Sequence, residues 1–412
     1  MTKRQFSTRL IHDSEEPRIE GAVSLPIFQS ATYRATSGVE TTYDDIRYLR
    51  LSNSPNHQRL AQKLAGLCEA EAALVTGSGM AAISTTLLSL VKTGDHILAQ
   101  DCLYGGTLSF LHEEAPGLGI DVDFVDAEEP DSWAEVCRPQ TRLFYVETMS
   151  NPLLKVPDLP AVVDFCQQHS LTSLIDNTFA SPALFQPLSM GFDVELHSAT
   201  KYLNGHSDIV AGCVASTREH ISTITHRLNH LGGILDPHAC FLLHRGLKTL
   251  ELRMTQQCHN AQMLAERLQE HPDVSQVHYP GLSSHPAHQR ASEWFGGCGG
   301  VLSFSVVGDG ARAQRLLNQL TLAVDAPSLG GVETLVSRPA VSSHAGQSAQ
   351  QRQTLGISDQ LIRVAVGIEA AQDLWDDFEQ ALDASAPNLK SFQWKIRKCL
   401  KNNKLRILHP FS

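Results

Sequence analysis

Short β-rich runs alternate with segments of helical period between about residues 60 and 215. Apolar residues recur at helical spacing in segments such as Met80–Val91 and Leu159–His169. The alternation predicts a three-layer α/β fold, in which helices cover both faces of a mostly parallel sheet. Ligands of such sheets bind beyond the carboxyl ends of the strands, so we expect the site in the loops there. The predicted strands are Ala72–Thr76, His96–Gln100, Asp121–Val125, Arg142–Glu147, Thr172–Ile175 and Ile209–Ala215.

Four regions are predicted along the 412-residue chain. Residues 1–60 lack a steady period and predict an N-terminal arm that reaches a neighbouring subunit. Residues 61–245 make the α/β domain, and residues 246–385 make a smaller C-terminal α+β domain. Residues 386–412 form a basic tail, because 390–412 holds seven basic residues and no acid. The elements expected towards the C-terminus are a long helix Cys240–Glu270, strands Val274–Tyr279, Gly300–Val306 and Leu361–Val366, and helices Ala311–Leu320 and Ala370–Leu382.

Charge and cysteine usage narrow the class of protein. The net charge of −11 argues against a nucleic-acid partner, because phosphate binding needs a basic face. Nine cysteines without a CxxC pair predict neither a zinc site nor a disulfide framework, and nineteen histidines form no HExxH motif. No apolar run approaches the roughly 20 residues that span a bilayer, and the first residues lack a signal core. We therefore expect a soluble cytoplasmic protein without a metal centre or a membrane partner.

A glycine-rich turn, Thr76–Ala82, follows a predicted strand and opens a helix. Free backbone N–H groups and the positive helix end favour a phosphate at such a junction. Gly77, Gly79 and Ala82 also fit the G-x-G-x-x-A pattern, and Asp101 ends the next strand. The turn by itself leaves an NAD-binding Rossmann site, a different phosphate site and a turn without a ligand open.

A second constellation favours a phosphorylated aldehyde cofactor over a dinucleotide. Asp176 stands at the carboxyl end of a strand, and Lys201 follows some 25 residues later in the run His197–His206. An amine close to the hydroxyls of Ser198 and Thr200 provides both a covalent attachment point and phosphate donors. An acid at a strand end can keep a pyridinium nitrogen protonated.

These motifs resemble the γ-family of fold-type-I pyridoxal-phosphate (PLP) enzymes of sulfur amino-acid metabolism. The resemblance rests on Gly77–Met80, Asp176–Thr178 and Ser198–His206, and it runs in motif order from about residue 20 to 385. The family contains cystathionine γ-synthase, cystathionine β- and γ-lyases and methionine γ-lyase. It implies pyridoxal 5′-phosphate as cofactor, an amino acid as substrate and a homo-oligomer, expected to be a tetramer built from two dimers.

The resemblance also implies roles for individual residues. Lys201 would carry the cofactor and move protons, and Tyr104 would stack on the ring and protonate the leaving sulfur. Asp176 would pair with the pyridine nitrogen. The phosphate would be held by Gly79, Met80, Ser198 and Thr200, and by Tyr48 and Arg50 of the neighbouring subunit. The substrate carboxylate would be bound by Arg363, with Ser328 and Asn151, because arginine offers a planar fork of donors.

Family motifs do not choose between elimination at Cβ, elimination at Cγ and replacement at Cγ. Two positions depart from the pattern: Pro327 precedes Ser328, and Arg47 precedes Tyr48. Both should affect the pocket for the distal part of the substrate, and Arg47 is a candidate partner for a distal carboxylate. We expect a carbon–sulfur lyase. The alternatives are a synthase of the cystathionine γ-synthase type and an inactive binding protein that has kept the fold.

Overall fold

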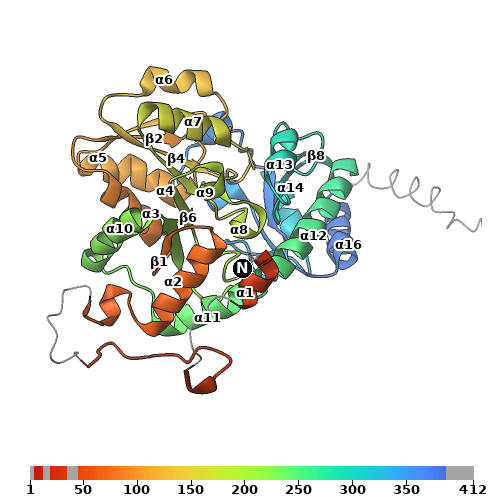
Figure 1. Ribbon diagram of the computed structural model, residues 1–412. Helices are drawn as coiled ribbons and strands as arrows, with labels where there is room; N and C mark the ends of the chain where they lie inside the picture. Colours follow the sequence, from red (N-terminus) through yellow and green to blue (C-terminus); the bar gives the residue numbers. More distant parts are fainter. Residues whose placement is uncertain (1–3, 13–18, 35–44, 387–412) are drawn as a thin grey trace, which may run out of the picture.

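The computed structural model describes residues 4–12, 19–34 and 45–386. Its larger part is built on a seven-stranded sheet in the order β1-β7-β6-β5-β4-β2-β3 (Figure 1). Only β7 runs against its neighbours, β1 and β6, and the four other pairings are parallel. The strands are β1 Ala72–Thr76, β2 His96–Gln100, β3 Asp121–Val125, β4 Thr141–Glu147, β5 Thr172–Asp176, β6 Val194–His197 and β7 Gly212–Ser216. The predicted mostly parallel α/β sheet is confirmed.

Apolar residues on both faces of the strands explain why helices cover both sides of this sheet. On β4, Phe144 and Val146 are buried in one core, whereas Leu143 and Tyr145 are buried in another. Successive strand side chains point to opposite faces, so each core occupies one face. The first core is closed by α2 (Pro55–Leu67), α7 (Leu159–His169) and α11 (Pro237–Leu247), and the second by α3 (Gly79–Leu90) and α10 (Arg218–Leu231).

A second sheet of five strands follows in the order β10-β11-β12-β9-β8. Its strands are β8 Val274–His278, β9 Val301–Val306, β10 Val324–Asp325, β11 Leu335–Ser337 and β12 Leu361–Ala365. A third apolar core lies between this sheet and the helices α12 (Leu250–Glu270), α14 (Gly310–Leu317) and α16 (Ala371–Ser385). The helix α12 contributes Leu250 and Met254 to the core of the first sheet and Ala261 and Leu264 to that of the second. It therefore joins the two parts of the molecule.

Shorter α-helices connect these elements. They are α1 Phe6–Ile11, α4 Gly105–Ser109, α5 Ala115–Gly117, α6 Trp133–Val136, α8 Ser181–Leu184, α9 Pro187–Met190, α13 His288–Trp294 and α15 Ala349–Thr354. The predicted basic tail from residue 387 onwards lies outside the described residues, as do parts of the predicted arm. The predicted domain boundaries near residues 60, 245 and 385 stay predictions.

One predicted element was wrong, and another began at the wrong residue. The single helix expected at Cys240–Glu270 is two helices, α11 and α12, which are separated at Lys248 and Thr249. The predicted strand Ile209–Ala215 begins three residues later as β7, because Thr200 hydrogen-bonds Ala211 and holds that segment out of the ladder. The strands β6, β10 and β11 were not predicted.

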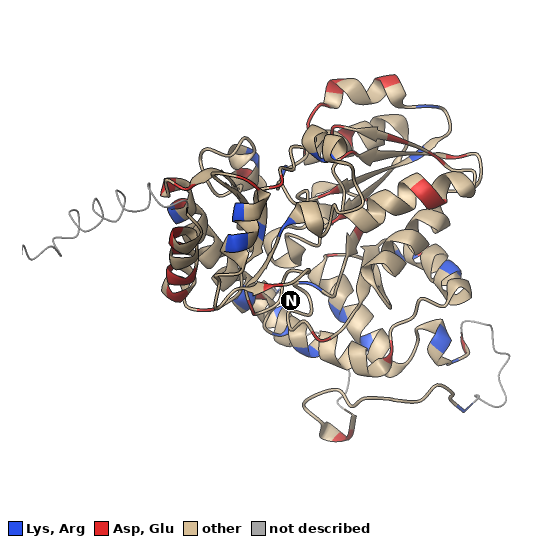
Figure 2. Ribbon diagram, turned by 180° about the vertical axis from the view of Figure 1, so that it is seen from behind, with Lys and Arg blue, Asp and Glu red and all other residues tan. Residues whose placement is uncertain are grey.

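Figure 2 shows acidic and basic residues spread over the helices and loops, while most of the ribbon of the strands carries neither. Within the described ranges, no helix combines the length and apolar character needed to cross a membrane.

Candidate active site

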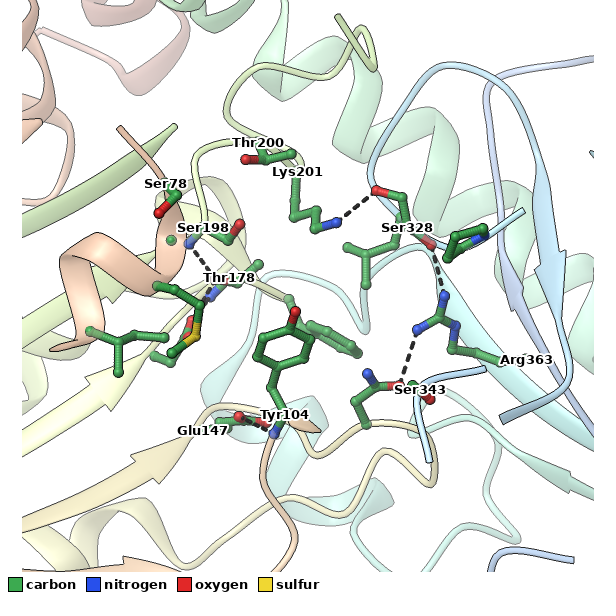
Figure 3. A pocket seen from close by; sticks show the side chains of 18 of the residues that line it. Ser78, Tyr104, Glu147, Thr178, Ser198, Thr200, Lys201, Ser328, Ser343 and Arg363 are labelled. Carbon is green, nitrogen blue, oxygen red and sulfur yellow. Dashed lines mark hydrogen bonds between the residues drawn. The ribbon is translucent and has the colours of Figure 1, made fainter. Parts of the chain in front are cut away.

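A cavity of about 870 Å³ lies where the carboxyl ends of the first sheet face the second sheet. Asp176 ends β5, Glu147 ends β4, and Lys201 follows β6, whereas Arg363 comes from β12. Lys201 and Tyr104 point into this cavity from opposite sides (Figure 3). Residues far apart in sequence thus meet at the edge where parallel sheets bind their ligands.

The side chain of Lys201 reaches across to the loop before β11. Its Nζ donates to Oγ of Ser328 at 2.6 Å. Burial, assisted by the positive charge of Arg363, lowers the pKa of Lys201 to about 8. The amine is therefore neutral far more often near neutral pH than an exposed lysine, and a neutral amine is the nucleophilic form.

One end of the cavity is shaped to receive an anion. The helix α3 begins at Gly79, and Ser78 caps it by accepting the N–H of Ala81 at 2.9 Å. A Cβ at position 79 would come within 2.8 Å of Oγ of Ser198, so only glycine lets the helix end approach this loop. The backbone N–H of Ser198 donates to Oγ1 of Thr178 at 2.8 Å, which fixes the loop. Asp101, which a dinucleotide site would need, is absent from the residues that line the cavity.

Two buried carboxyl groups lie side by side at the floor of the cavity. Asp176 and Glu147 are paired in register on the parallel strands β5 and β4. Asp176 accepts two hydrogen bonds from Thr178, one from the backbone N–H at 2.9 Å and one from the hydroxyl. Burial raises the pKa of Asp176, and the bonds from Thr178 oppose that rise. Burial and the neighbouring Asp176 raise the pKa of Glu147 well above its usual value.

Tyr104 is the N-cap residue of the short helix α4 and is 47% exposed. Its backbone N–H donates to Oε1 of Glu147 at 2.6 Å. The ring packs over Gly106, where an added Cβ would lie 2.7 Å from Cε1 of the ring. An accessible aromatic face that is fixed in this way can cover a planar ligand.

Arg363 is buried on β12 at the opposite end of the cavity. One Nη donates to Oδ1 of Asn151 at 3.2 Å and the other to the carbonyl of Ser328 at 2.8 Å. Its Nε is buried and makes no hydrogen bond within the described chain. Burial lowers the pKa of Arg363 to about 10, which still leaves it charged at neutral pH. A carboxylate is the natural partner for this planar cation.

The structure brings most of the predicted site residues together. Those that line the one cavity are Gly79, Met80, Tyr104, Asn151, Asp176, Ser198, Thr200, Lys201, Ser328 and Arg363. Arg47, Tyr48 and Arg50 do not line it. Arg50 donates instead to the carbonyl of Asn229 at 2.7 Å, and Arg47 lies over the ring of Tyr33. Their predicted roles concern a neighbouring subunit and stay predictions.

Sequence reasoning assigned no role to several lining residues, among them Ser78, Glu147, Thr178 and Ser343. Glu147 had a usable signal, because it is an acid at the end of a strand beside the one that carries Asp176. Ser343 had none, since it lies in an irregular segment after β11.

One group of three possible metal ligands occurs among the described residues: Cys68, Glu195 and His197, all buried. Nε2 of His197 and Oε1 of Glu195 are 2.8 Å apart, and Asn177 donates to the same oxygen at 2.8 Å. These separations are those of hydrogen bonds. The group therefore forms a hydrogen-bonded cluster beside the strand ends.

The chain matches the family described as Cys/Met metabolism PLP-dependent enzymes over residues 7–383. It is 42% identical over 365 residues to a cystathionine gamma-lyase of Bacillus subtilis (strain 168), covering 88% of this chain and 95% of that protein. It is 40% identical over 392 residues to cystathionine beta-lyase MetC of the same organism, covering 94% of this chain and 99% of that protein. An L-methionine gamma-lyase of Fusobacterium nucleatum subsp. polymorphum is 37% identical over 390 residues (92% and 98%). With the match covering nearly the whole chain, the protein belongs to the PLP-dependent enzymes of cysteine and methionine metabolism.

Proposed function

We propose that this protein is a carbon–sulfur lyase that acts on a sulfur-containing amino acid such as cystathionine or methionine. The observation that carries the proposal is the placement of Lys201 and Arg363 on one cavity, joined through Ser328. An amine that can take a proton thus faces a cation that can hold an α-carboxylate. The relatives described above bear the names of lyases for cystathionine and methionine.

The residues of the cavity fit pyridoxal 5′-phosphate. The N-terminus of α3, with Gly79, Met80, Ser198 and Thr200, would hold the phosphate. Asp176 would pair with the ring nitrogen, and Tyr104 would cover the ring face. When bound, the cofactor supplies a conjugated ring that accepts electrons from the substrate's Cα.

The protein's own groups would then bind the substrate and move protons. Arg363, with Asn151 and Ser328, would hold the α-carboxylate, and the bonding capacity of its buried Nε is available for this. Lys201 would take the proton from Cα, and for a γ-leaving group also from Cβ. The hydroxyl of Tyr104 would protonate the departing sulfur. Elimination at Cβ would yield a thiol, pyruvate and ammonia, and elimination at Cγ would yield 2-oxobutanoate in place of pyruvate.

We further propose that the working form is a homo-oligomer, a tetramer of two dimers, in which Tyr48 and Arg50 complete the phosphate site of a neighbour. This accounts for the absence of both residues from the cavity of their own chain.

The same arm carries Arg47, which would face the distal end of the neighbour's substrate. An Arg47→Ala change should then lower kcat/KM for cystathionine much more than for methionine. Equal losses would leave Arg47 a structural role only.

The function is tested by incubating the purified holoenzyme separately with cystathionine, methionine and cysteine and identifying the keto acid released. Pyruvate from cystathionine indicates cleavage at Cβ, and 2-oxobutanoate indicates cleavage at Cγ. A parallel reaction of an activated homoserine ester with cysteine would reveal a synthase, since it yields cystathionine. The Lys201→Ala protein is the control. If none of the three substrates yields a keto acid, the proposed lyase is contradicted.

A further inference from the structure

Glu147 is a buried acid that the proposed chemistry does not use. It ends β4, is 4% exposed and lines the cavity beside Asp176. The two cations that line the cavity, Lys201 and Arg363, are engaged with Ser328 and Asn151. No ion pair of Glu147 occurs in the described part of the chain. A second anion so close to Asp176 would be costly, because two neighbouring buried carboxylates repel each other.

Hydrogen bonding indicates which of the two acids carries the negative charge. Asp176 accepts two donors from Thr178, which stabilise its carboxylate form. Among the described residues, the donor that bonds the carboxyl of Glu147 is the backbone N–H of Tyr104. Where the pair holds one proton, this difference favours Glu147 as its carrier, because the carbonyl oxygen of a protonated Glu147 can still accept the bond from Tyr104.

This bond matters because it ties the backbone of Tyr104 to the end of β4, whereas the carbonyl of Tyr104 accepts from Leu108 of its own helix at 2.9 Å. Tyr104 precedes the first residue of α4 and has no side-chain cap. Its half-exposed ring projects into the cavity above Glu147 (Figure 3). The backbone of Glu147 is itself fixed, because its N–H donates to Oε1 of Gln100 at 3.0 Å. Glu147 thus connects the rigid end of β4 to the residue that would cover the cofactor.

We propose that Glu147 is a positioning residue that works as a neutral carboxylic acid, holding Tyr104 over the cofactor ring and leaving Asp176 as the one anion beneath it. The inference rests on the proposed cofactor site. It predicts that cofactor binding requires a hydrogen-bond acceptor at position 147 but does not require a negative charge there.

Two variants of Glu147 separate the effect of its acceptor oxygen from the effect of its charge. Glu147→Gln keeps an acceptor oxygen and removes the ionisable group, whereas Glu147→Ala removes the acceptor. We expect the glutamine variant to retain the visible circular dichroism of the bound cofactor and a cofactor dissociation constant within about threefold of wild type. The alanine variant should bind the cofactor about five- to tenfold more weakly and show a changed dichroism band. Ser173→Ala is the matched control, because Ser173 is also buried on a strand but bonds Asp193, outside the cavity.

The role of Tyr104 is tested by repeating both changes in a Tyr104→Ala background. If Glu147 acts through Tyr104, the alanine change at 147 has little further effect on cofactor affinity there. If Glu147→Ala lowers cofactor affinity equally in the presence of Tyr104 and in the Tyr104→Ala background, and by more than the control variant does, the positioning role is overturned. A glutamine variant as impaired as the alanine variant would overturn the neutral form. If the wild-type protein binds the cofactor but cleaves no substrate, the proposed lyase is contradicted, and the role of Glu147 can still be tested by cofactor affinity and dichroism. If the wild-type protein binds no cofactor, both the proposed function and the role of Glu147 are refuted.

Discussion

The amine of Lys201 donates at 2.6 Å to the hydroxyl of Ser328, a residue 127 positions further along the chain that has a φ of 122°. L-residues rarely adopt this backbone conformation, and strained residues persist only where the surroundings fix them. The carbonyl of the same serine accepts a bond from Arg363 at 2.8 Å. One strained residue therefore links the proposed proton-transfer group to the proposed carboxylate group.

Two substitutions of Ser328 should separate the effect of its hydroxyl on activity from the effect of its backbone strain on stability. Ser328→Ala and Ser328→Gly both remove the bond to Lys201, so each should lower kcat/KM by about five- to tenfold. The glycine protein should be more stable than the alanine protein by about 1 kcal/mol, because glycine tolerates a positive φ. Chemical denaturation and steady-state kinetics measure the two effects. An alanine protein as stable as the glycine protein would show that the strain is small.

Arg363→Lys should keep the positive charge and lose the planar fork of donors. We expect kcat/KM to fall by about 10- to 100-fold, mainly through KM, because the substrate carboxylate loses a charge-assisted contact. Arg290→Lys is the control, since Arg290 is a partly exposed arginine outside the cavity. Similar kinetics for the two lysine variants would contradict a carboxylate role for Arg363.

Loading of the cofactor should depend on pH through Lys201. Its pKa is lowered to about 8, so the neutral, reactive amine accumulates as the pH rises through that value. The rate at which the apoenzyme takes up pyridoxal 5′-phosphate should increase from pH 6 to 9 with a midpoint of about 8. Arg363→Met removes a positive charge that contributes to the lowering, and the midpoint should move upward. Stopped-flow absorbance follows the reaction, and a midpoint that moves downward would contradict this account.

Sharing of the site between subunits predicts complementation. In a heterodimer of a Lys201→Ala chain and an Arg50→Ala chain, one of the two sites has both residues intact. Such heterodimers should regain about half of the wild-type activity. A mixture of Lys201→Ala and Asp176→Ala chains is the control and should regain none, because those residues lie in the same cavity of one chain. Purified heterodimers without activity would exclude the shared site.

The strands and helices of the first sheet could be predicted from the sequence wherever apolar periodicity decides the structure. The strand β6 was missed because Glu195 and His197 make half of it polar. Both are buried and bond each other, which only the tertiary structure provides. The break between α11 and α12 was missed because Lys248 and Thr249 are neither proline nor glycine, and Gly246 just before them lies within α11.

For the site, the motifs predicted which residues meet but not how they are held. Asp176, Lys201 and Arg363 share the cavity as expected. Ser328, whose hydroxyl accepts the bond from Lys201, has a positive φ, and sequence gives no sign of that for a serine. The placement of Arg47 and Arg50 could not be derived either, because their predicted partners belong to another chain.

Lys201 is expected to carry the cofactor, and trapping the covalent linkage tests this most directly. Borohydride reduction of the purified holoenzyme, followed by proteolysis and mass spectrometry, converts the linkage into a stable pyridoxyl adduct on one peptide. We expect the adduct on Lys201, and we expect no adduct from a Lys201→Ala protein. An adduct on any other lysine of the wild-type protein would contradict this expectation.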